Sequence, residues 1–251
     1  MTSVPVDTTV TDGIGRVTVN HPPLNILTRT VLGGLREAVA SLAANQDLRV
    51  LVLAAEGKHF SVGADVGEHL PPDFREMIPE FLDTVAAIEA FPLPVIAAVT
   101  GRCLGGGFEL VQAADIVIVG EGASFGQPEI LLGVFPPAAC VILPERCAHG
   151  DAAEILFTGD PVSAADAHRI GLVQRVVPDD RLEQEAIALA ERIARHSAAA
   201  LRLTKRALKR PRGPEFDAVG ALYVDELMAT EDALEGLRAF QEKRTPVWSH
   251  Q

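Results

Sequence analysis

The stretch PVIAAVTGRCLGGGFELVQAADIVIV, residues 94–119, decides the fold. Residues 94–100 and 115–119 are dominated by apolar and β-branched side chains, which is typical of strands buried on both faces. Between them a glycine run leads into residues 108–114, which we expect to be helical. Buried strands that alternate with helices indicate the α/β class with a largely parallel sheet.

The preceding segments continue this alternation toward the N-terminus. They predict a half-buried strand at 15–20, a helix at 28–42, a buried strand at 49–55 and a helix at 81–90.

Beyond about residue 145 the pattern is helical. Ser163 and Asp166 have the spacing of a capping box, and Gly171 is a plausible end for that helix. Further helices are expected at 182–196, at 199–209 and at 216–242, the last broken near Thr230. We therefore predict an α/β core over residues 1–190 and a C-terminal helical region over residues 191–251.

The composition limits the classes of ligand and compartment. The 251 residues are 48% apolar and 5% aromatic, and this apolar content excludes intrinsic disorder. The net charge of −12 argues against nucleic-acid binding, which requires a basic surface. Residues 1–11 lack the basic and apolar segments of a secretory signal, and residues 130–143 are too short and interrupted to span a bilayer. We expect a cytoplasmic protein with no nucleic-acid or membrane partner.

Neither the cysteines nor the histidines have the spacing of a metal site. Cys103, Cys140 and Cys147 form no C-x-x-C pair, and we expect them to be small buried side chains. The seven histidines are scattered without H-E-x-x-H spacing, so we predict no metal ion.

The glycine run at 101–107 carries the first candidate chemistry. Its spacing, G-x-x-x-G-G-G, matches neither the dinucleotide fingerprint nor the P-loop. Glycines allow a ligand to approach the backbone, and N–H groups at a helix start can stabilise negative charge on an oxygen. Glu109 follows Gly106 by about one helical turn. The alternative is that the glycines only permit tight packing and Glu109 is solvated.

A second acid, Glu129, borders an uncharged stretch. Desolvation there would raise its pKa, and two carboxyl groups with different pKa values can act as a general acid and a general base. The alternative is an acid that only interacts with a helix dipole.

Several ordered motifs together resemble the crotonase (enoyl-CoA hydratase/isomerase) superfamily. They are KHFSVGAD at 58–65, LGGGFEL at 104–110, FGQPEI at 125–130, PLN at 23–25, and EDALEG and FQEKR at 231–236 and 240–244. The resemblance covers nearly the whole chain.

The resemblance implies a crotonase-like spiral of ββα units whose C-terminal helices support a homo-trimer or a dimer of trimers. It implies an acyl-CoA thioester as substrate and no cofactor beyond that CoA. By similarity, the backbone N–H groups of Ala64 and Gly106 would form an oxyanion hole. CoA and substrate contacts would come from Leu24, Ala64, Asp65, Val66, Gly67, Gly106 and Lys243.

Retention of both glutamates favours hydration of a 2-enoyl-CoA within this family. Glu109 would hold the water as the base, and Glu129 would deliver the proton to Cα. The alternatives are an enoyl-CoA isomerase, another enolate-stabilising crotonase, or a non-catalytic CoA-binding paralogue. A serine peptidase of the same spiral architecture is disfavoured, because Ser61 and Ser124 lack a recognisable triad context.

One segment departs from the family pattern. Residues 135–144, FPPAACVILP, stand where hydratases usually have a glycine-rich run. We expect Phe135 and Pro136 to shape the acyl pocket, which puts a simple straight-chain substrate in doubt. The Phe-Pro-Pro turn resembles the branch that hydrates alicyclic dienoyl-CoA thioesters such as cyclohexa-1,5-diene-1-carbonyl-CoA.

Six cations gather near the C-terminal helices. These side chains could attract the phosphates of CoA, or they could form a solvated helix face. We favour the solvated helix face for most of them. They are Arg202, Lys205, Arg206, Lys209, Arg210 and Arg212.

Overall fold

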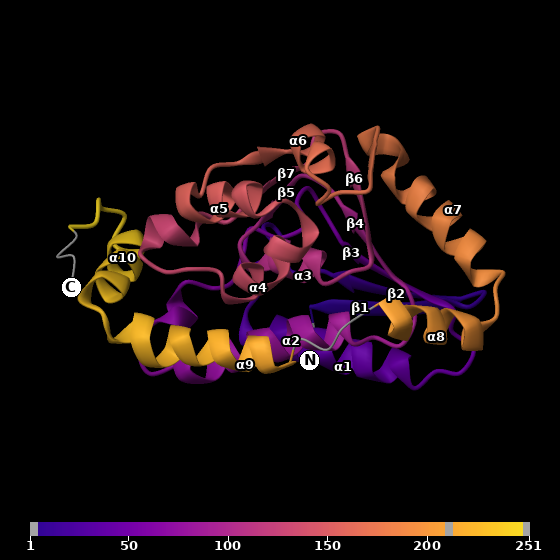
Figure 1. Cartoon of the computed structure of the whole chain (residues 1–251), viewed down its shortest axis with the longest axis horizontal. Helices are drawn as coiled ribbons and strands as arrows, with labels where there is room; N and C mark the ends of the chain where they lie inside the picture. Colours follow the sequence, from indigo (N-terminus) through magenta and orange to yellow (C-terminus); the bar gives the residue numbers. More distant parts are fainter. Residues whose placement is uncertain (1–4, 209–212, 248–251) are drawn as a thin grey trace.

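A computed structural model describes residues 5–208 and 213–247. Its main sheet has six strands in the order β1-β2-β3-β4-β6-β9, antiparallel only between β1 and β2 (Figure 1). The alternation predicted from residues 94–119 is therefore confirmed as an α/β fold with a mostly parallel sheet. The strands are β1 (Val6–Thr11), β2 (Ile14–Val19), β3 (Val50–Ala55), β4 (Val95–Val99), β6 (Ile116–Gly120) and β9 (Arg175–Val177).

A second, smaller sheet has the order β5-β7-β8 and follows the glycine run. It comprises β5 (Arg102–Leu104), β7 (Ser124–Gly126) and β8 (Val162–Ser163). Because β5 leads into one predicted acid and β7 into the other, the parallel pairing of these two strands brings Glu109 and Glu129 to one edge of the sheet.

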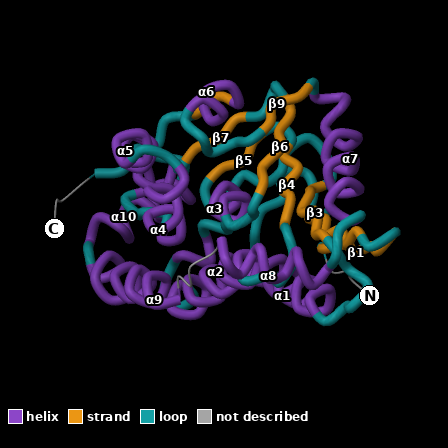
Figure 2. Tube along the Cα trace, turned by 45° about the vertical axis from the view of Figure 1, so that its right-hand side comes forward, coloured by secondary structure: helices purple, strands orange, loops and turns teal. Residues whose placement is uncertain are grey.

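Helices cover both faces of the main sheet, with α7 on one side and α3 on the other (Figure 2). The helices are α1 (Arg29–Ala43), α2 (Phe74–Glu89), α3 (Gly106–Gln112), α4 (Pro137–Arg146), α5 (His149–Thr158), α6 (Ala164–Arg169), α7 (Leu182–Ala194), α8 (Ala198–Leu208), α9 (Gly213–Ala221) and α10 (Glu231–Gln241).

Helices cover both faces of the main sheet, and this explains why a strand such as β3 is apolar at every position. Val50 and Val52 of β3 pack in the cluster formed with α7, whereas Leu51 and Leu53 pack in the larger core on the opposite face. Successive strand residues point to opposite faces, so a sheet covered on both sides needs an apolar residue at every position.

The predicted end signals in the helical half are confirmed. The Ser163 hydroxyl accepts a hydrogen bond from the N–H of Asp166 at 3.1 Å, and Gly171 has a φ of +92° just after α6. Thr230 interrupts the C-terminal helices with an extended backbone and caps α10 through the N–H of Ala233.

Several boundaries differ from the sequence prediction. Helix α2 begins at Phe74 instead of residue 81 and contains Pro79. Strands β8 and β9 lie in the part of the chain that was predicted to be helical. The boundary predicted at residue 190 falls inside α7, whose Leu189 and Ala190 are buried against the sheet.

One cation of the basic cluster has a structural role. Lys205 is buried, its Nζ lies 2.8 Å from Oδ2 of Asp115, and it donates to the carbonyl of Leu93. It therefore ties α8 to the start of β6 and is not solvated. Lys209, Arg210 and Arg212 lie outside the described residues. Among the helices of the described residues, none is long and apolar enough to cross a membrane.

Candidate active site

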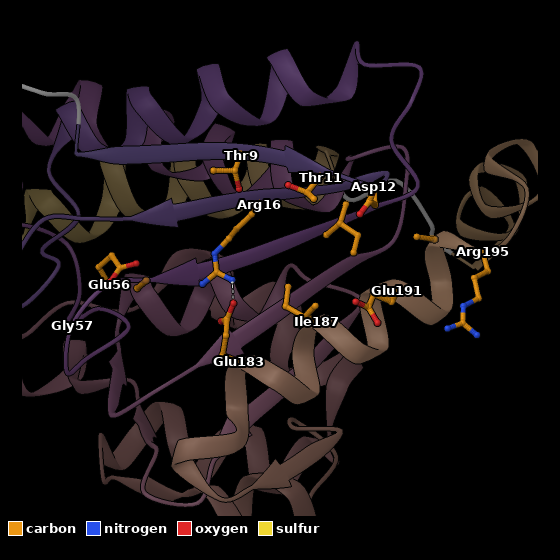
Figure 3. Close-up of a pocket in the computed structure, with 13 residues that line it drawn as sticks. Thr9, Thr11, Asp12, Arg16, Glu56, Gly57, Glu183, Ile187, Glu191 and Arg195 are labelled. Atoms are coloured by element: carbon orange, nitrogen blue, oxygen red, sulfur yellow. Dashed lines mark hydrogen bonds and ion pairs between the residues drawn. The ribbon is translucent and has the colours of Figure 1, made fainter.

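Two hollows in the described part of the chain differ in chemistry. A polar groove of about 950 Å³ lies between the β1–β2 hairpin and α7, where Arg16 pairs with Glu183 (Figure 3). None of the predicted site residues lines it. A second pocket of about 380 Å³ is mostly apolar and contains both predicted acids. Six predicted residues line this second pocket: Ala64, Val66, Gly106, Glu109, Glu129 and Phe135.

Glycines allow the parts of this pocket to approach one another. Gly105 has a φ of +51°, and a Cβ there would lie 2.5 Å from Oε1 of Glu129. A Cβ on Gly106 would lie 3.0 Å from the ring of Phe81 and 3.5 Å from the nitrogen of Ala64. The glycine run therefore holds the backbone against both the carboxyl group and the facing loop.

Two backbone N–H groups at this point have no acceptor among the described residues. The Ala64 segment is extended and pairs with Leu27 through its neighbours, Gly63 O and Asp65 N, so the N–H of Ala64 points the other way. Gly106 is the first residue of α3, where N–H groups lack intrahelical partners. Both residues line the pocket, which is the arrangement expected of an oxyanion hole.

Glu109 is 2% exposed and lies in the first turn of α3. Its Oε1 accepts a hydrogen bond of 2.8 Å from the N–H of Ala139, near the start of α4. Burial raises the pKa of Glu109 from 4.5 to about 7, although the N–H groups of Ala139 and Ala138 act in the opposite direction. The pKa of this carboxyl group therefore lies in the neutral range.

Glu129 follows β7 in the short 3₁₀ helix Pro128–Leu132. Its Oε2 is buried and has no hydrogen-bond partner among the described residues. Burial, together with the charge of Glu109, raises the pKa of Glu129 well above 4.5. No backbone donor from another segment counters this burial, so the pKa values of both carboxyl groups are shifted toward the protonated form.

The remaining predicted residues surround the pocket without lining it. The carboxylate of Asp65 accepts from the N–H groups of Gly67 and Glu68, so it shapes the turn. Gly67 lies against Gln241 at the end of α10, two residues before the exposed Lys243. Five predicted residues belong to this group: Leu24, Asp65, Gly67, Pro136 and Lys243.

Sequence reasoning missed three polar side chains around the pocket. His69 lines it and contacts the carbonyl of Asp65 through Nδ1 at 2.8 Å. Tyr223 packs its ring edge-on against Phe135, with centroids 5.2 Å apart. Cys140 lies near both acids, and burial raises its pKa to about 12. Only the rarity of tyrosine in this chain, which has one, sets Tyr223 apart in the sequence.

The fold and the pocket define a class of α/β protein in which two backbone segments with free N–H groups among the described residues line one pocket together with two buried carboxyl groups. The chain belongs to the enoyl-CoA hydratase/isomerase family, whose model matches residues 9–251.

Individual relatives agree with this membership. The chain is 40% identical to cyclohexa-1,5-dienecarbonyl-CoA hydratase of Thauera aromatica over 242 residues, 94% of this chain and 92% of the relative. It is 38% identical to a probable enoyl-CoA hydratase of Mycobacterium tuberculosis over 94% of this chain and 95% of the relative. An enoyl-CoA hydratase structure from Mycobacterium avium subsp. paratuberculosis superposes with a TM-score of 0.86 at 31% identity, covering 98% of both chains.

Proposed function

We propose that this protein hydrates the double bond of a 2-enoyl-CoA thioester. The observation that carries the proposal is one apolar pocket with two buried carboxyl groups of raised pKa and two backbone N–H groups that have no acceptor in the described part of the chain. The names of the relatives, which are hydratases of enoyl-CoA and dienoyl-CoA thioesters, support the same reaction class.

In the proposed mechanism the thioester oxygen accepts hydrogen bonds from the N–H groups of Ala64 and Gly106. Ionised Glu109 takes a proton from water as the water oxygen bonds to Cβ, and the electron pair of the double bond moves onto the thioester as an enolate. Glu129 then gives its proton to Cα, which restores the thioester carbonyl. Transfer of the proton from Glu109 to Glu129 resets the pair.

The CoA portion would leave the pocket past the Asp65–Gly67 turn, toward Leu24 and Lys243. Lys243 has the charge needed to meet a CoA phosphate, and it follows α10, whose Leu237 and Phe240 line the pocket. We further propose a cytoplasmic homo-trimer or dimer of trimers that needs no cofactor besides the CoA of its substrate. An isomerase is disfavoured because Glu109 is held in position at the pocket by Ala139.

The acyl group we propose is a cyclic dienoyl. The segment that departs from the hydratase pattern supplies Phe135 to the pocket wall and buries Pro136, and its Ala139 holds Glu109. The 40% identical relative is named for such a substrate.

Steady-state kinetics with two thioesters tests both the hydration reaction and the cyclic acyl group that we propose. We expect kcat/KM to be higher for cyclohexa-1,5-diene-1-carbonyl-CoA than for crotonyl-CoA, because a rigid ring fills an apolar pocket whose wall is stiffened by proline. A preference for crotonyl-CoA would contradict the cyclic substrate, and the absence of hydration with both thioesters and with a wider enoyl-CoA panel would contradict hydratase activity.

The pKa of Glu109 predicts the pH dependence of hydration. A base must be ionised, so kcat/KM should fall about tenfold per pH unit below pH 7. Above pH 7 it should level off until Glu129, which must hold its proton, ionises in turn. Initial rates measured from about pH 5.5 to pH 8 check this expectation. The Glu109→Gln variant should lose the dependence along with most of its activity, and a flat profile in the unaltered protein would exclude Glu109 as the base.

A further inference from the structure

Tyr223 has a buried hydroxyl that the proposed mechanism does not use. The residue is 1% exposed, and its Oη has no hydrogen-bond partner among the described residues. A buried hydroxyl left unpaired costs about 1–3 kcal/mol, so such a group in a folded protein needs an explanation.

The ring of Tyr223 packs against the wall of the acyl pocket. It lies edge-on to Phe135 at 5.2 Å and tilted against His69 at 6.4 Å, and both of these residues line the pocket. After burial, the charges of Glu129 and Glu109 are the causes that raise the pKa of Tyr223, which is consistent with a hydroxyl close to the acids.

The backbone around Tyr223 is also unusual. Helix α9 continues into a π-helical turn, Leu222–Glu226, which contains this residue. Single π turns insert a residue into a helix and are frequent at functional sites, because the insertion turns one side chain away from the regular face.

A second unpaired polar atom lies in the same region. Oε2 of Glu129 is buried without a partner in the described part of the chain, and Glu129 lines the same pocket as Phe135 and His69, against which the ring of Tyr223 packs. A phenol is a donor and a carboxyl oxygen an acceptor, and a hydroxyl group can accept from the first while it donates to the second. A methylene in the same place would leave both atoms unpaired.

We propose that the hydroxyl of Tyr223 and Oε2 of Glu129 form a subsite for a hydroxyl group on the acyl portion of the thioester. This inference rests on the proposed function. The hydroxyl comes either from the water added at Cβ or from a hydroxyl that the acyl group already carries. Tyr223 is then a specificity-determining residue that distinguishes hydroxylated from unsubstituted acyl groups.

Binding of three thioesters of equal chain length tests this subsite. Butyryl-CoA, 3-hydroxybutyryl-CoA and 4-hydroxybutyryl-CoA would be titrated by calorimetry into Glu109→Gln protein, in which turnover is blocked, with and without Tyr223→Phe. Phenylalanine keeps the ring and removes only the hydroxyl. We expect Tyr223→Phe to weaken a hydroxylated thioester roughly two- to tenfold and to leave the Kd of butyryl-CoA unchanged.

The two possible sources of the hydroxyl predict different changes in Kd among the three thioesters. Weakening of 3-hydroxybutyryl-CoA identifies the oxygen added from water, whereas weakening of 4-hydroxybutyryl-CoA alone identifies a hydroxyl that the acyl group brings. Equal weakening of all three thioesters would mean that Tyr223 only packs against the pocket, and no weakening of any would also overturn the subsite.

A spectroscopic measurement separates this role from a structural one. Because the chain contains one tyrosine, protein labelled with ¹³C at Cζ of tyrosine has a single resonance that reports hydrogen bonding of Tyr223. It should shift with a hydroxylated thioester and not with butyryl-CoA. Hydration by the unaltered protein is assayed separately, so a missing reaction counts against the proposed function, and a missing shift counts against the subsite.

Discussion

We expect Glu129→Gln to lower kcat for hydration by roughly 10²- to 10⁴-fold, the range that general acid catalysis contributes. The protonated carboxyl of Glu129 and the glutamine amide are both neutral and nearly the same shape, so the buried site can accept the change without unfolding. Glutamine has no acidic proton to give to Cα, and the enolate therefore returns to substrate. The loss is measured as the rate at which the enoyl-thioester absorbance disappears.

Glu109→Gln should lower kcat over the same range by removing the base that activates water. Both variants should bind a saturated acyl-CoA as the unaltered protein does, because neither acid is placed on the proposed path of CoA. The matched control is Glu121→Gln, an exposed acid at the end of β6 that does not line the acyl pocket. Full hydration activity in either pocket variant would refute the assignment of the two acids.

Gly105→Ala should impair both folding and catalysis. The residue has a φ of +51° and a ψ of −130°, a conformation that disfavours any side chain, so alanine should cost about 1–3 kcal/mol of stability. Its Cβ would lie 2.5 Å from Oε1 of Glu129 and would push the acid away. A displacement of about 1 Å can cost 10²-fold in rate, and we expect a loss of roughly that size.

Thermal unfolding and initial hydration rates measure the two effects of Gly105→Ala. The control is Gly33→Ala in α1, where no atom lies within 4 Å of the added Cβ. Alanine there should stabilise the helix by about 0.5–1 kcal/mol and leave the hydration rate unchanged. Normal stability and normal activity of Gly105→Ala would show that this glycine does not hold Glu129 in place.

The buried strands could be predicted from the sequence because both faces of the main sheet are covered. Strand β3 is apolar at every position, a pattern that needs no knowledge of its partners. Strand β1 could not be predicted in this way, because five of its six residues are exposed and only its pairing with β2 defines it. The sequence prediction placed the start of α2 at residue 81, seven residues too late, because the first two turns of this helix contain Pro79, a residue that is disfavoured inside helices.

The candidate site could be predicted from spacing only where its residues are close together in the sequence. Gly106 and Glu109 lie one helical turn apart, so their relation follows from spacing. The parallel pairing that brings Glu129 beside them joins segments about 20 residues apart, and it was reached through resemblance to the family. Tyr223 is 88 residues from Phe135 in the chain, and the helical pattern around Tyr223 does not indicate that the two rings pack together.

The two buried acids also couple the folding of the chain to proton concentration. Both would ionise near 4.5 in water, but in the folded protein the pKa of Glu109 is raised to about 7 and burial raises that of Glu129 well above 4.5. Folding therefore takes up protons from solution across this interval, and the native state is favoured most by these groups below pH 4.5. Their contribution to stability declines as the pH rises toward neutrality, where Glu109 must lose its proton to act. The two acids proposed for catalysis therefore contribute least to the stability of the folded state in the pH range in which Glu109 must be ionised.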